Sequence, residues 1–177
     1  MLKRIAGFLA TAALLTPLSV FAQEPMKLTA LDYIEIQQLV ARYARAIDTC
    51  SNNGYDYADL YTPDGRFVPM VGGRSIPPIE GREALAAVSG GGTNNCENVP
   101  WIDQGIRHIY SNHIITPTPE GASGTVDMMM IGLDGDPYKI AHDGFYEDIY
   151  AKTSEGWKFA QRTHHALLDA GQPIDDN

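Results

Sequence analysis

The sequence predicts an α+β domain, in which helices come first along the chain and an antiparallel sheet follows. Residues 29–48 carry apolar side chains at spacings of three and four, the period of a helix with one buried face. The second half instead carries four runs rich in Ile, Tyr, Met, Val and Phe, which are separated by hairpin turns. Helices followed by a meander of strands are typical of an α+β architecture.

The first helix is predicted to begin after Thr29 and to end near Asp48. Thr29 followed three residues later by Asp32 is a capping signal. The apolar stripe of this helix consists of Tyr33, Ile36, Val40, Tyr43 and Ile47. Asp48 follows the stripe on the adjacent ridge, so we expect it to border the buried face.

Shorter elements are predicted between this helix and the sheet. Residues 55–61 form a short helical piece, residues 66–71 a strand and residues 81–88 a third helix. Residues 89–100 are rich in Gly, Asn and Thr, which indicates a long surface loop or lid. The strands of the second half are predicted at residues 107–115, 124–133, 138–151 and 157–164.

The first 22 residues are predicted to be a secretory signal peptide that is cut after Ala22. A basic start precedes an apolar run, and the chain turns polar at Gln23. The alternative is a membrane anchor, but Pro17 interrupts the run, which is shorter than the ~20 residues that a span needs. Removal of 22 residues from 177 leaves 155, which suits one domain at residues 23–177, located in the periplasm or secreted.

The charge of the chain excludes two classes of partner. Loss of Lys3 and Arg4 with the signal peptide changes the formal net charge from −9 to −11. The remaining Lys and Arg residues are scattered, with no run of three. We therefore expect neither nucleic acid nor, after the signal is removed, a membrane as a partner.

The two cysteines leave two interpretations open. Cys50 follows the first helix and Cys96 lies in the Gly/Asn-rich loop. Export to an oxidising compartment favours a disulfide between them, which would steady the neighbourhood of Asp48. The alternative is two unrelated thiols, because the sequence does not show whether their Cα atoms lie within the ~7 Å that a bridge needs.

Asp48 and His108 are the residues most suited to chemistry. An acid at the border of an apolar helix and an imidazole in an apolar strand can form an acid/base dyad if the fold brings them together. Alternation in the strand places Tyr110 and Asn112 on the face of His108. The simpler interpretations are a helix-end Asp48 that bonds backbone and a His108 that is satisfied within the core. Tyr33, Tyr43 and Tyr146 likewise suit either a core or a pocket for an aromatic ligand.

Other kinds of site find little support. His108 and His113 are an odd number of residues apart in one strand, so they point to opposite faces, and no zinc-type spacing of His and Cys occurs. The glycine run 90–92 lacks the context of a phosphate loop, and no Gly-x-Ser-x-Gly motif is present. Asp148 and Arg162 are expected to form a cross-strand ion pair. We therefore expect no metal and no cofactor.

The order of six motifs resembles the SnoaL-like branch of the nuclear transport factor 2-like superfamily, over nearly all of residues 23–177. The motifs are Tyr43-x-x-x-x-Asp48, Leu60-Tyr61-Thr62-Pro63-Asp64-Gly65-Arg66-Phe67, Gly81-Arg82-Glu83-Ala84, Arg107-His108-x-x-x-Asn112, Gly144-x-Tyr146-x-Asp148 and Trp157-Lys158-Phe159-Ala160-x-Arg162. The resemblance implies a cone-shaped barrel, in which three N-terminal helices wrap a curved antiparallel sheet around one deep pocket. It also implies a homodimer or homotrimer.

Members that resemble scytalone dehydratase use an aspartate at the end of the first helix and a histidine at the start of the sheet as an acid/base pair. The resemblance thus implies that His108 moves the proton and that Asp48 is its partner. The implied substrate-binding residues are Tyr43, Tyr146, Asn112, Tyr33, Tyr110 and His142. Ile47 stands where scytalone dehydratase has a tyrosine, and that enzyme's second histidine and pocket asparagine have no match. Dehydration of its particular substrate is therefore not implied.

The sequence thus predicts an exported, cofactor-independent lyase or isomerase that acts on a small, aromatic molecule. Dehydration, retro-aldol cleavage with elimination of formaldehyde, and isomerisation are all compatible with an Asp–His pair. The alternative is a binding or association module that uses the same pocket without chemistry. Contact between Asp48 and His108, directly or through one water, favours the enzyme.

Overall fold

The computed structural model describes residues 23–71, 73–133 and 138–169, so the predicted signal peptide lies outside the described residues. The helical elements are α1 (Ala30–Thr49), η1 (Ser51–Gly54), α2 (Tyr55–Ala58), α3 (Arg82–Val88), η2 (Gly92–Asn94) and α4 (Pro100–Asp103). The strands are β1 (Tyr61–Val71), β2 (Arg74–Ser75), β3 (Ile79–Glu80), β4 (Arg107–Thr118), β5 (Gly121–Leu133), β6 (Tyr138–Thr153) and β7 (Gly156–Asp169). Within the described ranges, no helix combines the length and the apolarity that a membrane crossing requires.

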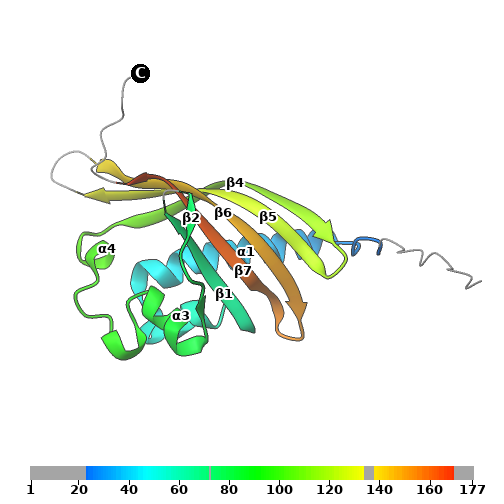
Figure 1. The fold of residues 1–177 in the computed structure, drawn as a ribbon, viewed down its shortest axis with the longest axis horizontal. Helices are drawn as coiled ribbons and strands as arrows, with labels where there is room; N and C mark the ends of the chain where they lie inside the picture. Colours follow the sequence, from blue (N-terminus) through cyan, green and yellow to red (C-terminus); the bar gives the residue numbers. More distant parts are fainter. Residues whose placement is uncertain (1–22, 72, 134–137, 170–177) are drawn as a thin grey trace, which may run out of the picture.

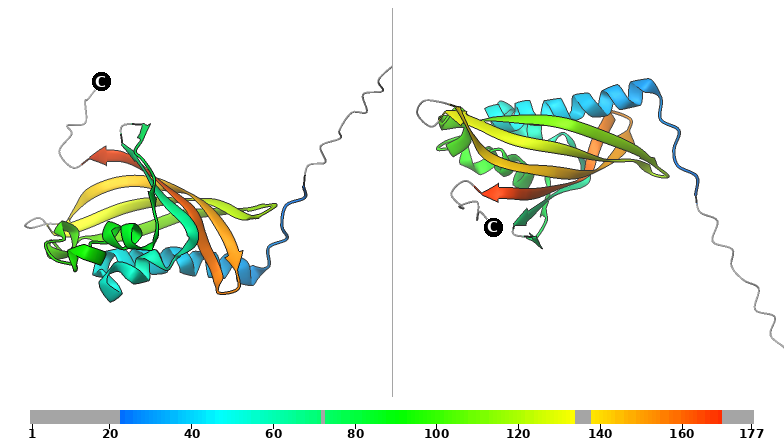
Figure 2. Two further views of the ribbon diagram at one scale, coloured as in Figure 1. Left: turned by 60° about the horizontal axis from the view of Figure 1, so that its bottom comes forward. Right: turned by 90° about the horizontal axis from the view of Figure 1, so that it is seen from above.

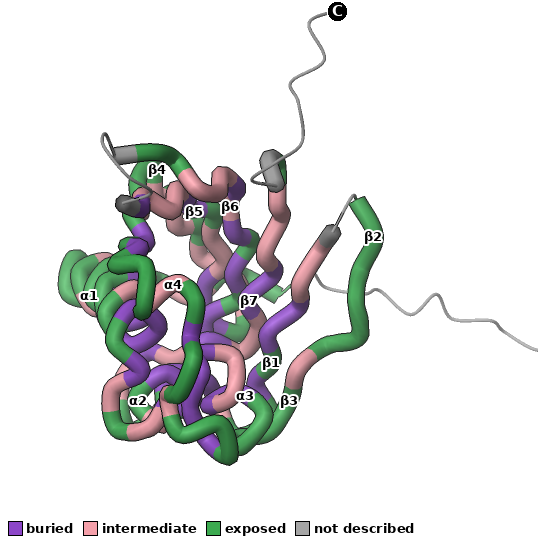
Figure 3. The backbone as a smooth tube through the Cα atoms, turned by 90° about the vertical axis from the view of Figure 1, so that its left-hand side faces the viewer, coloured by how far each residue is buried: buried purple, intermediate pink, exposed green. Residues whose placement is uncertain are grey.

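The predicted α+β class is confirmed: helices come first, and a curved sheet that does not close on itself follows. The seven strands have the order β2-β1-β7-β6-β5-β4, and β3 pairs with β1. Figure 2 shows the sheet as a curved surface with two free ends. β2, at one end, is exposed along its length, whereas β1 and β7 carry buried stretches (Figure 3).

One pair of strands departs from the predicted antiparallel arrangement. β1 and β7 run parallel, whereas the other pairs in the described sheet are antiparallel. A parallel pair needs a long crossover connection. Here the chain between β1 and β7 supplies α3, α4 and five strands, β2 to β6. The last strand can therefore lie beside the first.

α1 lies against the concave face of the sheet, while α3 and α4 lie near one end (Figure 1). α1 packs on β4 and β7. Four of the five stripe residues that the sequence indicates are buried, and Tyr33, in the first turns, is half-buried. Tyr43 is fully buried and lies in the core with Met128 of β5 and Phe159 of β7. The core thus sits between the helix and the concave face.

Several register shifts interrupt the sheet, and two of them, one in β4 and one in β7, change which side chains of the site face the core. In β4, the register shifts between Ser111 and Ile114, where Asn112 has a left-handed φ of 52°. In β7, Phe159 pairs with Tyr150 and Gln161 pairs with Ile149, so Ala160 is the extra residue. One extra residue reverses the faces of the side chains that follow it, as far as the next register shift of the strand.

The start of α1 is held by Asp32 in the capping box that the sequence predicts. Asp32 Oδ2 accepts the Thr29 backbone N–H at 2.8 Å, and Thr29 Oγ1 accepts the Asp32 N–H at 3.3 Å. Asp32 Oδ1 accepts Lys152 Nζ at 2.5 Å and Trp157 Nε1 at 3.0 Å. The Lys152 bond, together with those from Thr29 and Trp157, holds the pKa of Asp32 well below its usual range.

Asp32→Asn is expected to lower the melting temperature at about pH 7, because the amide loses the charge that Lys152 and the capping site stabilise. A carboxyl with a depressed folded pKa stabilises the fold above its unfolded pKa of ~3.9, and this contribution is lost as the pH falls through the folded pKa. The loss in the variant should therefore shrink below about pH 4. Circular dichroism melts between about pH 3 and pH 7 measure this loss of melting temperature, with Asp56→Asn, at an exposed carboxylate, as the control. A loss that does not change with pH would contradict the stabilising role of the Asp32 charge.

Candidate active site

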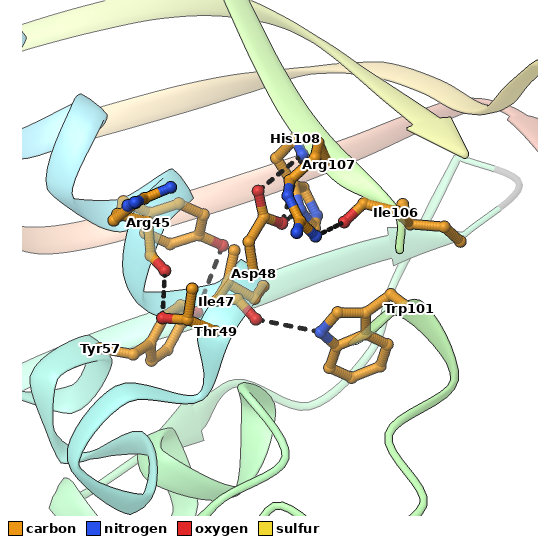
Figure 4. A network of polar contacts seen from close by, with 10 residues as sticks. Arg45, Ile47, Asp48, Thr49, Tyr57, Trp101, Ile106, Arg107 and His108 are labelled. Carbon is orange, nitrogen blue, oxygen red and sulfur yellow. Dashed lines mark hydrogen bonds and ion pairs between the residues drawn. The ribbon is translucent and has the colours of Figure 1, made fainter. Parts of the chain in front are cut away.

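Asp48 and His108 are in direct contact, although they come from distant segments of the chain. Asp48 is the last residue but one of α1, and His108 is the second residue of β4. Asp48 Oδ1 lies 2.6 Å from His108 Nδ1, and Asp48 Oδ2 accepts the His108 backbone N–H at 3.1 Å (Figure 4). Both side chains are buried, at 6% and 5% exposure.

This contact sets the tautomer of the imidazole. Facing a carboxylate, Nδ1 of neutral His108 is the donor, so Nε2 carries the lone pair. Asp48 also holds the backbone of His108, so two bonds orient the ring. The simpler interpretation placed Asp48 at the helix end, bonded to neighbouring backbone; here it bonds the backbone and the imidazole of a residue 60 positions away.

His108 lines a cavity of about 510 Å³. This volume is within the usual range for small-molecule sites. Tyr43, Tyr146, Phe67 and Trp101 supply aromatic walls. The other apolar lining residues are Ile47, Val88, Pro100, Ile106, Met128, Met130 and Ala141. Such a lining favours a flat apolar ligand and strengthens polar interactions by excluding water.

A buried cation lies beneath the two tyrosines of this cavity. The Arg162 guanidinium carbon is 4.0 Å from the ring centroid of Tyr43 and 3.9 Å from that of Tyr146. Arg162 is fully buried, and Tyr110 and Phe159 complete the group of rings around it. Burial raises the pKa of Tyr43 and of Tyr146, so both phenols stay protonated and can donate hydrogen bonds.

Asp148 is the counter-ion of Arg162, as the sequence predicts. Its Oδ1 lies 3.3 Å from Arg162 Nε, within ion-pair distance, yet no guanidinium nitrogen has hydrogen-bond geometry to an acceptor among the described residues. The Tyr150 hydroxyl donates to Asp148 Oδ2 at 2.7 Å, and His113 Nε2 lies 2.9 Å from that hydroxyl. Burial raises the pKa of Asp148 to about 6, against the opposing effects of Arg162 and Tyr150.

Two further histidines line the cavity as a pair. His142 of β6 and His164 of β7 place their Nε2 atoms 3.2 Å apart. Burial, together with His142 and Arg162, lowers the pKa of His164 to about 4, so this ring is neutral near pH 7. His142 is among the predicted substrate-binding residues, whereas His164 is not. Its even spacing from Arg162 in the strand is the signal that could have found it.

Three other predicted substrate-binding residues lie away from the cavity lining. Asn112 is exposed in the β4 bulge and donates from Nδ2 to Asp127 Oδ2 at 2.7 Å. Its predicted place on the face of His108 is wrong, because the bulge interrupts the alternation of side chains along β4. Tyr33 is fifteen residues from Asp48 on α1, about 22 Å at 1.5 Å per residue. Tyr110 lies behind the wall, with its ring centroid 5.8 Å from that of Tyr146.

The loop that covers this end of the fold is tied down at two points. Cys50 and Cys96 form a disulfide with a Cα–Cα distance of 6.0 Å, which joins the end of α1 to the loop before α4. Trp101 Nε1 donates to the Ile47 carbonyl at 3.1 Å (Figure 4). Residues 100–106 therefore form a wall of the cavity that is anchored to the helix carrying Asp48.

The residues that the structure describes provide no set of ligands for a metal ion. No group of three or more His, Cys, Asp or Glu among them has the geometry to hold one. What the cavity does contain is a carboxylate-bound imidazole, a histidine pair and two protonated phenols, all suited to moving or stabilising protons and oxygen charge.

Comparisons with known proteins identify the family to which these features belong. The model of the SnoaL-like domain matches residues 29–163. No curated protein matches the sequence significantly. Among solved structures, an NTF2-like protein with a cystatin-like fold from Novosphingobium aromaticivorans has a TM-score of 0.65 at 21% identity, covering 77% of this chain and 82% of that one.

Two further solved structures share the fold. ActVI-ORFA from Streptomyces coelicolor has a TM-score of 0.62 at 17% identity, covering 78% of this chain and 98% of that one. A Catenulispora acidiphila protein in complex with S-DNPA has a TM-score of 0.58 at 25% identity, covering 77% of this chain and 95% of that one.

Proposed function

The chain belongs to the SnoaL-like domain family, and from this membership and its buried dyad we propose that it is an exported, cofactor-independent lyase or isomerase. The observation that carries the proposal is the 2.6 Å contact between Asp48 Oδ1 and His108 Nδ1 in the wall of an apolar cavity. The proposed substrate is a small aromatic molecule with an acidic hydrogen next to a carbonyl or phenol.

His108 is the proposed general base. Its Nε2 lone pair removes a proton from carbon or from a hydroxyl group of the ligand. Asp48 keeps the proton on Nδ1 and faces the positive charge that develops on the ring. The same ring then returns the proton to the product, so the reaction needs no external acid or base.

The cavity supports this chemistry in two ways. Its aromatic walls, which include the rings of Tyr43 and Tyr146, can hold a ring in one plane, and the protonated phenol of Tyr146 is a donor for an oxygen that gains negative charge. Arg162 beneath these rings adds a fixed positive charge, since both guanidinium–ring distances are about 4 Å. An enolate or phenolate is therefore the intermediate that this site would stabilise.

Nitrobenzisoxazole tests the proposal without knowledge of the natural substrate. A base removes its ring C–H proton, the N–O bond breaks, and a coloured cyanonitrophenolate forms. We expect the wild-type protein to accelerate this ring opening with saturation kinetics, well above the same concentration of free imidazole. A rate equal to that of free imidazole would contradict the proposal and favour a binding module in which the cavity performs no chemistry.

A further inference from the structure

His164 and His142 lie across the sheet from the proposed base. His108 pairs with Met130, and Met130 pairs with His142, so these residues form one row over β4, β5 and β6. Two strand spacings separate the backbones of His108 and His142 by about 10 Å. His164 comes from β7, the next strand. A ligand in the cavity therefore has His108 at one side and the histidine pair at the other.

Gly144 makes the histidine pair possible. It lies between His142 and Tyr146 on the inner face of β6, and His164 pairs with Tyr146 on the neighbouring strand. A Cβ atom at residue 144 would lie 3.3 Å from His164 Nε2 and 2.4 Å from the His165 carbonyl oxygen. The absence of a side chain there lets the His164 ring reach diagonally to His142.

The contact between the two rings limits where their protons can lie. His164 is neutral near pH 7, so when its Nε2 accepts a hydrogen bond from His142 Nε2 across the 3.2 Å contact, a single proton lies between the two rings. The accepting ring must then carry its own proton on Nδ1. In this arrangement Nδ1 of His164 is an N–H donor. A neutral imidazole in this state can polarise a carbonyl oxygen.

We propose that the His142–His164 pair is a second hydrogen-bonding site of the cavity. The pair donates a hydrogen bond to a substrate oxygen while His108 removes the proton. This inference rests on the proposed function and narrows the substrate to a molecule with an acidic hydrogen at one side and a carbonyl oxygen at the other. Ketols and β-hydroxy ketones with an aromatic ring have this pattern.

For a β-hydroxy ketone the step is a retro-aldol cleavage. His108 Nε2 takes the hydroxyl proton, the hydroxyl oxygen becomes an aldehyde oxygen, and the carbon–carbon bond breaks. Its electron pair moves through the α-carbon onto the ketone oxygen, which the histidine pair stabilises as an enolate. The proton on His108 then returns to the enolate carbon, so an aldehyde and a ketone leave and His108 is restored.

Two test substrates distinguish the role of the histidine pair from the role of His108 as the base. Ring opening of nitrobenzisoxazole needs a base. Its phenolate product is already stable, so a hydrogen-bond donor to the phenolate oxygen adds little to the rate. Cleavage of the aldol adduct of acetone and methoxynaphthaldehyde, followed by fluorescence of the released aldehyde, needs a donor for the enolate as well. We expect His164→Phe to lower kcat for the aldol adduct about 100-fold, the usual loss for one oxyanion donor, and to lower nitrobenzisoxazole opening much less, so that the ratio of the two rates falls by about tenfold or more.

The matched control is His165→Phe, because His165 is the next residue of β7, lies on the outer face and stacks on Phe145. It should change neither rate. His142→Phe should reproduce the selective loss, and it serves if His164→Phe does not fold. Equal losses on both test substrates, no loss on either, or no cleavage of the aldol adduct by wild type would overturn the inference. Failure of the base itself is recognised separately, since nitrobenzisoxazole opening would then be absent.

Discussion

Asp48→Asn is expected to lower the rate of proton abstraction from nitrobenzisoxazole by about 100- to 10,000-fold without unfolding the protein. Asparagine has nearly the same size as aspartate and can still accept the His108 backbone N–H through its amide oxygen. It removes the charge that faces the imidazole, and its NH₂ group can bond Nδ1 in the wrong tautomer. The Nε2 atom would then carry a hydrogen and could not act as a base.

His108→Gln should abolish the rate entirely, because the base itself is removed. Steady-state kinetics of both variants test the dyad. Asp127→Asn is the control, since Asp127 is an exposed carboxylate of β5 that accepts a hydrogen bond from Asn112. Circular dichroism melts should show all three variants folded. Folded Asp48→Asn protein that retains more than about a tenth of the wild-type rate would show that Asp48 is a helix-end residue and no partner of the base.

Arg162→Met is expected to destabilise the protein by about 3–5 kcal/mol, the usual cost of removing one partner of a buried ion pair. Arg162 is fully buried, and methionine would leave Asp148 as an isolated charge at 0% side-chain exposure. The four rings around the guanidinium would also lose their cation–π contacts. Urea unfolding of the variant and wild type measures the difference.

The pH dependence of this loss provides an independent check. Burial already raises the pKa of Asp148 to about 6 with Arg162 present, and Arg162 opposes that rise. For an acid whose folded pKa is above its unfolded value, stability falls as the pH rises from the unfolded pKa through the folded one. Without Arg162 the folded pKa should rise further, so the variant should lose more stability at about pH 8 than at about pH 5.

Two comparisons identify the cause of the loss. The double variant Arg162→Met, Asp148→Asn should recover part of the stability, because no uncompensated charge remains. Arg66→Met, which removes an exposed arginine bonded to Gln161 on the same sheet, should change stability by less than about 1 kcal/mol. A double variant as unstable as Arg162→Met alone would show that packing against the rings, and not the buried charge, causes the effect.

Local patterns were sufficient for α1 and for the order of the elements. The Thr29–Asp32 capping box lies within four residues, and the apolar stripe that buries Tyr43 repeats within one helix. Because both depend on neighbours along the chain, the sequence determined where α1 begins and that Asp48 borders its buried face. The succession of helices and strands is likewise a local property, and it identified the α+β class.

Contacts between distant segments decided the remainder of the site. The pairing of Asp48 with His108, and of Cys50 with Cys96, depends on how the loop and β4 pack on the end of α1. Alternation placed Asn112 beside His108, but the extra residue in β4 turns it outward, while the extra residue in β7 turns Arg162 and His164 inward. The side-chain period of a strand holds only along an uninterrupted ladder, and a bulge forms where two strands must fit a curved sheet. The sequence by itself therefore determined the elements and the acid at the end of α1, whereas only the tertiary structure decided which polar side chains share its cavity.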